Sequence, residues 1–300
     1  MALKNLPALK ELRHDSIVET LAYLHQTALR EGVPTDTKYS LSALAIRITS
    51  PYRRGNLSEA VSLCPSLNKV EIKTPDGFSD RDLLDLLPVE KLCDLTISGT
   101  RTSQVSFDEG VSPLFRKNSI GNSLISLVLC HFSKVNIRII TEYCPNLRFL
   151  TLDKNDRFVE SYDEDERRED QRNNQLTAPQ KLKKLETLKI VSCNSPSNLV
   201  LLLSSPSLVS VTLDHCYALT DDVLQKVADL DTFQNLEFFE VISNFRITKQ
   251  GIDTLMREKN PLKVIKLKDC TNVTEKNMED WKQQIRDENW QLSITKKGRF

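Results

Sequence analysis

Aliphatic residues recur along this chain with the spacing L-x-x-L-x-L, and the ninth position of the motif is often Asn or Cys. The clearest copy is Leu185-Glu-Thr-Leu188-Lys-Ile190-Val-Ser-Cys193. The complete copies begin at Leu147, Leu185, Leu208, Leu236 and Leu262. Within each copy, apolar and variable positions alternate at the centre, which is typical of a short strand with one buried side.

Incomplete copies extend the pattern toward both ends. Copies beginning at Leu67, Leu92 and Leu124 lack the final Asn or Cys, the copy at Ala43 is weaker, and Leu9 begins a truncated one. The ten starting positions from Leu9 to Leu262 are mostly 23 to 28 residues apart. Longer steps follow Leu9, Leu92 and Leu147, and these steps contain insertions. At the other end, Leu292 and Ile294 predict a closing strand.

The segments between copies have helical spacing. Ser197–Leu203 and Asp221–Leu230 are the clearest helices, and Thr220-Asp221 is a helix-capping pair. A strand followed by a helix at this period is the leucine-rich repeat. One repeat cannot bury its apolar side alone, so repeats stack into a solenoid. We therefore predict an α/β leucine-rich-repeat solenoid, a ribonuclease-inhibitor-like horseshoe of about ten strand-helix repeats, with a parallel sheet on its concave face.

The pattern also predicts the domain organisation. We expect one repeat domain over 1–300, with a degraded capping repeat over 1–40 and a C-terminal cap over 271–300. An acidic insert over 157–174 interrupts the array. Its sequence favours a solvated loop with little to bury, and the alternative is an acidic arm that binds a basic partner.

Composition excludes several classes of function. The 41 acidic and 41 basic residues give a net charge of zero, so we expect neither nucleic acid nor membrane as a partner. Of the seven cysteines, Cys193, Cys216 and Cys270 occupy the ninth motif position, and Cys64 and Cys144 stand before Pro at predicted helix ends. These are structural positions for small buried groups, which indicates reduced thiols and a cytoplasmic or nuclear location.

The sequence predicts no catalytic, cofactor-binding or metal-binding residues. His131 and His215 adjoin Cys130 and Cys216, but no further Cys or His follows at zinc spacing. A surface position at the end of a strand is expected for His215. No glycine-rich phosphate loop and no Gly-x-Ser-x-Gly motif occur. We therefore expect that the protein is not an enzyme.

The turns resemble those of the F-box/leucine-rich-repeat proteins. The residues concerned are Cys64-Pro-Ser-Leu67, Cys144-Pro-Asn-Leu147 and Cys216-Tyr-Ala-Leu-Thr-Asp221. The resemblance covers about residues 40–280 and implies a role like that of the substrate-recognition part of an SCF-type ubiquitin ligase receptor. No F-box is recognisable near Leu6-Pro7. The alternative is a stand-alone repeat scaffold or inhibitor with no ubiquitin link.

Strand alternation identifies the residues that face away from the core. They predict a protein-binding surface on the concave face of a monomer, made by Phe149, Thr151, Asp153, Thr187, Lys189, Val191, Thr212, Asp214, Phe238, Glu240, Ile242, Lys266 and Lys268. Phe149, Val191, Phe238, Ile242 and Val264 are apolar where the repeat does not require it. Such residues are either exposed anchors for a partner or side chains packed under neighbouring loops.

Overall fold

The structure is a computed structural model that describes residues 9–11, 14, 16–32, 38–46, 52–100, 104–116, 120–132, 134–154, 182–230, 232–256 and 261–298. The chain divides into two compact units, an N-terminal unit of Met1–Ser133 and a C-terminal unit of Lys134–Phe300. The predicted acidic insert at 157–174 lies outside the described residues.

Among its described residues, the N-terminal unit contains four parallel strands that pair in chain order. They are β1 (Ala43–Ile46), β2 (Lys69–Lys73), β3 (Asp94–Ser98) and β4 (Ser126–Cys130). Between them lie α3 (Asn56–Leu63), α4 (Asp80–Leu83), the 3₁₀ turn η1 (Leu84–Leu86), the π-helical turn η2 (Phe107–Val111), α5 (Ser112–Arg116) and α6 (Ile120–Ser123).

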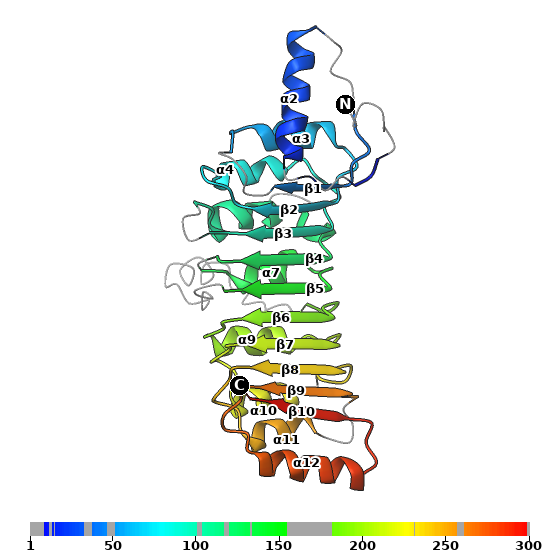
Figure 1. Ribbon diagram of the computed structural model, residues 1–300, viewed down its shortest axis with the longest axis vertical. Helices are drawn as coiled ribbons and strands as arrows, with labels where there is room; N and C mark the ends of the chain where they lie inside the picture. The colour runs from blue at the N-terminus through cyan, green and yellow to red at the C-terminus, as the bar shows by residue number, and fades with distance from the viewer. Residues whose placement is uncertain are drawn as a thin grey trace, which may run out of the picture. The chain divides into compact units, whose positions relative to one another are not determined.

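Helix α2 (Ile17–Arg30) precedes β1 and packs against α3. Ile17, Val18, Leu21 and Ala22 are buried, so its first two turns belong to the core. Its last turns extend beyond α3 (Figure 1) and expose Tyr23 and Leu29. Leu9, predicted to begin a truncated repeat, lies in a segment without regular secondary structure.

The C-terminal unit repeats the same arrangement with six parallel strands among its described residues. They are β5 (Phe149–Asp153), β6 (Thr187–Val191), β7 (Ser210–Asp214), β8 (Phe238–Ile242), β9 (Val264–Lys268) and β10 (Ser293–Lys297). The helices are α7 (Ile137–Tyr143), α9 (Pro196–Leu203), α10 (Asp221–Asp229), α11 (Lys249–Leu255) and α12 (Glu275–Asp287). Figure 1 shows α9 behind the strands, and α11 and α12 below β10.

These elements confirm the predicted leucine-rich-repeat fold: an α/β arrangement of parallel strands alternating with helices. In the strands of the complete copies, buried motif residues alternate with at least partly exposed ones, except at Val191 in β6. In β7, for example, Val211 and Leu213 are fully buried between partly exposed neighbours. The closing strand predicted at Leu292 and Ile294 is β10, which pairs with β9 through Ile294 and Ile265.

The predicted helices and their cap are also confirmed. The structure places α9 over 196–203 and α10 over 221–229, and the Thr220 hydroxyl accepts a hydrogen bond from the Val223 amide at 3.3 Å. Such a cap satisfies one of the amides that the first helical turn leaves without a partner.

Both units join consecutive helical segments by the same device. The Asp221 carboxylate at the start of α10 accepts hydrogen bonds from the amide and hydroxyl of Thr248, at 2.9 and 2.6 Å. Asp80 at the start of α4 accepts the same two bonds from Ser106, at 2.7 and 3.1 Å. A glycine follows each time, Gly251 or Gly110, and a Cβ atom there would collide with the aspartate.

The predicted caps contain ordered elements. Residues 1–40 include α2, and residues 271–300 include α12 and β10. In α12, Trp281 is fully buried and its indole N–H donates to Asp253 of α11 at 2.7 Å. The limits of the domain and of both caps remain predictions. Among the described residues, no helix combines the length and the apolar character that a bilayer crossing requires.

Candidate functional site

The candidate binding surface is the side of β5–β10 that faces away from the core, which we call the open face. Parallel register aligns its residues in rows that run across the strands. The first row is Phe149, Thr187, Ser210, Phe238, Val264 and Ser293. The second is Thr151, Lys189, Thr212, Glu240, Lys266 and Thr295. The third is Asp153, Val191, Asp214, Ile242, Lys268 and Lys297.

The rows unite all thirteen site residues predicted from the sequence on one face of one unit. Twelve of them are half-buried or exposed, as the alternation of the strands predicts. Val191 is the exception. Only 9% of its surface is exposed, so it packs as part of the core and offers little to a partner. Of the two alternatives given for the apolar residues of this face, Val191 is therefore a packed side chain and not an exposed anchor for a partner.

The other apolar residues of the open face remain accessible. Phe149 is 41% exposed, and Phe238, Ile242 and Val264 are half-buried. Phe238 lies beneath the Lys266 ammonium, which is 4.9 Å from the centre of its ring. A cation above an aromatic face is attracted to it electrostatically. This contact holds the ring of Phe238 and the charge of Lys266 together on two adjacent strands.

Charge on the open face is mostly unpaired. Lys189, Lys266 and Lys268 are exposed, and none makes an ion pair with a described residue. Asp214, by contrast, contacts the neighbouring His215, whose Nδ1 lies 2.6 Å from the Asp214 carboxylate. His215 is half-buried at the end of β7, in agreement with its predicted surface position.

A hydrogen-bonded pair borders the first row. The Arg148 guanidinium donates to both oxygens of Glu186, at 2.8 and 2.7 Å, and lies 5.6 Å from the centre of the Phe149 ring. This bidentate bond lowers the pKa of the Glu186 carboxyl below its ordinary value. It also fixes the guanidinium beside the exposed ring of Phe149.

The turns that end the strands hold the open face in place. The residue directly after β6, β7, β8 or β9 is left-handed, with φ of 67°, 50°, 52° and 54° at Ser192, His215, Ser243 and Asp269. Each of these amides still donates to the next strand, as Ser243 does to Lys268 at 2.8 Å. The chain therefore leaves the sheet by a sharp bend that directs the following Asn or Cys inward.

Asn244, the ninth motif residue of its repeat, is buried and bonds to the backbone of two turns. Its buried amide group donates to the Cys216 and Leu219 carbonyls, at 2.8 and 3.1 Å. Its oxygen accepts from the amides of Arg246 and Ile247, at 2.7 and 3.0 Å. Four backbone groups of two consecutive turns thus obtain partners from one side chain.

The cysteines at the same position are also buried, as predicted. The Cys216 thiol contacts the carbonyl oxygens of Ile190 and Asp214, both at 3.6 Å. Burial raises the pKa of Cys193 to about 11 and raises that of Cys216 as well. All seven cysteines are free thiols in the structure. Among the described residues, no group of three potential ligands from His, Cys, Asp and Glu could hold a metal ion.

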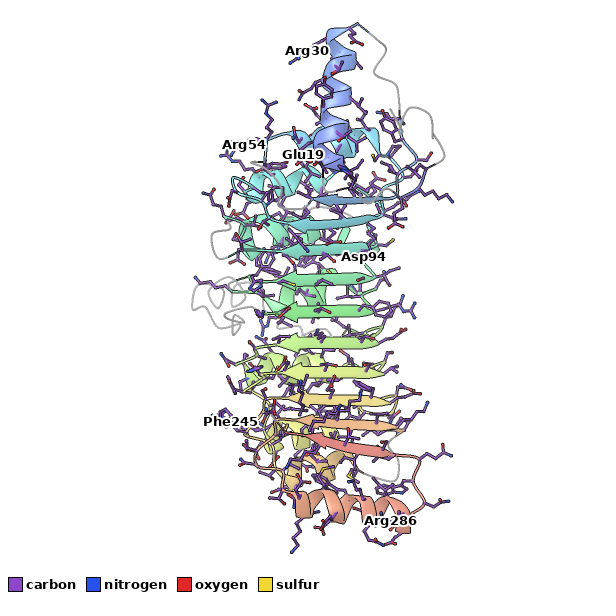
Figure 2. All side chains as sticks on the ribbon, in the orientation of Figure 1. Glu19, Arg30, Arg54, Asp94, Phe245 and Arg286 are labelled. Carbon is purple, nitrogen blue, oxygen red and sulfur yellow. The ribbon has the colours of Figure 1, made fainter. Side chains whose placement is uncertain are left out.

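Sequence reasoning missed an aromatic pair beyond the carboxyl ends of the strands. Tyr217 and Phe245 are 39% and 53% exposed, and their ring centres are 5.2 Å apart. Phe245 projects from its turn beyond β8 (Figure 2). The sequence contains a signal for this pair, because each aromatic residue directly follows the ninth motif residue of its repeat.

Comparisons with known proteins show likeness in structure alone. No protein-family model matches the sequence, and no curated protein matches it. The structure is similar to a chain in the crystal structure of the Rad7 and Elc1 complex in yeast. The two are 16% identical, with a TM-score of 0.37, over 92% of this chain and 87% of that one.

Proposed function

We propose that this chain is a non-enzymatic binding scaffold and that the open face of β5–β10 holds a protein partner. One observation carries the proposal: accessible apolar side chains stand among unpaired lysines, on a face where the fold requires neither. The core of the repeat is built by its inward residues and does not need large apolar groups on the open face. Large apolar anchors surrounded by charged residues are the usual source of binding energy in protein interfaces.

Phe238 is the proposed central anchor. It lies on β8, between the strands that supply Ser210 and Val264, and carries the Lys266 ammonium above its ring. Replacing the ring by a methyl group removes both the apolar surface offered to the partner and the cation–π contact with Lys266. We expect Phe238→Ala to weaken partner binding by about 1–4 kcal/mol, which is roughly 5- to 1000-fold in affinity.

The test is affinity capture from cell lysate followed by mass spectrometry, with wild type, Phe238→Ala and Val128→Ala compared. Val128 is the matched control, because it is an aliphatic residue on the outward side of β4. A partner retained by wild type and Val128→Ala but lost by folded Phe238→Ala supports the proposal. A partner that all three proteins retain equally contradicts it.

In its finer form, the proposal is that the partner is a protein presented for ubiquitination. The cysteine form of the repeat, with buried Cys216 and Cys270 turns, supports this choice over a stand-alone inhibitor. Co-purification of a cullin–RING ligase adaptor with the wild-type chain would support a ligase role. A reproducible partner without any ligase subunit would favour the stand-alone scaffold.

A further inference from the structure

A pocket of about 410 Å³ lies at the carboxyl ends of β7–β10. It is built from equivalent positions of three consecutive repeats. The positions directly after β7, β8 and β9 contribute His215, Ser243 and Asp269, and the positions two residues further contribute Tyr217, Phe245 and Thr271. Its volume falls within the roughly 300–1,000 Å³ of sites that bind compact ligands.

One wall of the pocket is the aromatic pair Tyr217 and Phe245. Hydrogen bonds to their own backbone hold it in position: the Arg246 guanidinium donates to the Tyr217 carbonyl at 3.1 Å, and the Asn272 amide donates to the Phe245 carbonyl at 2.5 Å. Buried Asn244 fixes the turn between them. The backbone that carries the two exposed rings is therefore fixed, and the rings contact each other with their centres 5.2 Å apart.

Lysines border the pocket on its β9–β10 side, where Asp269 also lines it. Lys297 of β10 is part of the lining, and Lys268 of β9, its partner in the strand register, lies outside it. Both are exposed, and neither makes an ion pair with a described residue. Lys296 also lines the pocket but is already paired with Glu275 at 2.8 Å. Like charges opposite each other on adjacent strands repel. An anionic group between Lys268 and Lys297 would reduce this electrostatic repulsion.

We propose that this pocket takes a short segment of a partner protein that places a carboxylate beside a large apolar side chain. The rings of Tyr217 and Phe245 pack against the apolar side chain, and Lys268 and Lys297 bind the carboxylate. The inference rests on the proposed function and deepens it, because it names the chemistry of the partner. Lys268 belongs to the open face, so the segment would continue directly from that surface.

Titration of the isotopically labelled full chain with short peptides tests this, with amide chemical shifts as the readout. The probes are acetyl-Asp-Glu-Phe-Glu-Asp-amide, its neutral analogue with Asn and Gln, and its analogue with Ala in place of Phe. We expect the first peptide to shift the amides of Ser243, Phe245 and Asp269. Each analogue should bind at least about tenfold more weakly, a difference of about 1.4 kcal/mol.

Variants locate the site. Phe245→Ala and the double variant Lys268→Gln/Lys297→Gln should each weaken peptide binding about tenfold or more. Tyr23→Ala and Lys73→Gln remove an exposed aromatic ring and an exposed ammonium from the N-terminal unit and should leave peptide binding unchanged. The inference is wrong if the pocket amides do not shift at peptide concentrations on the order of 10 mM, well above a millimolar dissociation constant. It is also wrong if the neutral peptide binds equally well.

The proposal for the open face and the proposal for the pocket can be disproved independently of each other. If the peptide does not bind, but Phe238→Ala still abolishes partner capture, the pocket inference falls and the binding scaffold stands. If the peptide binds in the pocket, but Phe238→Ala retains every partner, the pocket stands and the open face is not the main binding surface.

Discussion

The two units build the same strand ladder but end their strands with different chemistry. In the C-terminal unit, the ninth motif position holds Cys193, Cys216, Asn244 or Cys270, all of them buried. In the N-terminal unit, the equivalent positions hold Pro75, Thr100 and Phe132. Phe132 is as buried as the cysteines. The inward aliphatic ladder is therefore what the fold requires, and the Asn or Cys is one of several ways to fill the turn.

The outward faces differ as well. On the N-terminal unit, the outward positions of β1 are Ala43 and Ala45, and Lys69 pairs with Asp94 at 2.8 Å. None of its described strands carries an outward aromatic residue. The open face of the C-terminal unit carries Phe149 and Phe238 together with unpaired lysines. This contrast within one chain supports the proposal that the binding surface lies on the C-terminal unit.

The largest expected loss of stability is at the Asn244 turn, which is the clearest difference in turn chemistry between the two units. Asn244→Ala leaves two carbonyls and two amides without their side-chain partner, so we expect unfolding free energy to fall by at least about 3 kcal/mol. Denaturant titration measures this. Asn272→Ala is the matched control, since its exposed amide also donates to a carbonyl, and it should cost less than about 1 kcal/mol. Equal losses in the two variants would show that the buried network contributes nothing special.

Thiol reactivity should distinguish the half-buried cysteines from the buried ones. Cys93 and Cys130 of the N-terminal unit are half-buried, whereas Cys64 of that unit and all four cysteines of the C-terminal unit are buried. Burial raises the pKa of Cys144 to about 12, which depletes the reactive thiolate. At pH 8, iodoacetamide should modify Cys93 and Cys130 at least about a hundredfold faster than Cys144, Cys193, Cys216 and Cys270. Peptide mass mapping over time gives the rates, and uniform labelling of all seven would overturn the assignment.

Changes at the helix junction should lower the stability of both units alike, because both units contain this junction. Gly110→Ala and Gly251→Ala each direct a Cβ atom onto the aspartate of the preceding helix. We expect each to cost about 1–3 kcal/mol through overpacking. Gly298→Ala has open space around its new methyl group and serves as the control. Thermal unfolding would contradict the shared role if only one junction variant were less stable than the control.

The smallest effect is expected for the ion pair on the N-terminal face. Asp94→Asn removes the partner of Lys69, whose side chain is 48% exposed. Water screens such a pair, so stability should change by less than about 1 kcal/mol. Partner binding should not change. A clear loss of binding in Asp94→Asn would move the interface to the N-terminal unit.

The sequence alone predicted most of the fold, because each strand is marked by inward residues with a period of two. It also predicted the outward rows, since alternation decides which side chains leave the core. It could not place Val191, because burial at a strand end depends on side chains that meet only in the folded chain. It missed the left-handed residues after the strands, since Ser192, His215 and Asp269 have no side-chain type in common. The Tyr217–Phe245 contact required two repeats to be stacked before the rings could meet.

The central claim is that a protein partner covers the open face of the C-terminal unit and leaves the N-terminal face free. Lysine acetylation of the chain, alone and with a captured partner, tests it most directly, because exposed lysines occur on both faces. We predict that the partner protects Lys189, Lys266 and Lys268 and leaves the acetylation of Lys69 and Lys73 unchanged. Protection of Lys69 and Lys73 with none at Lys189, Lys266 and Lys268 would contradict it.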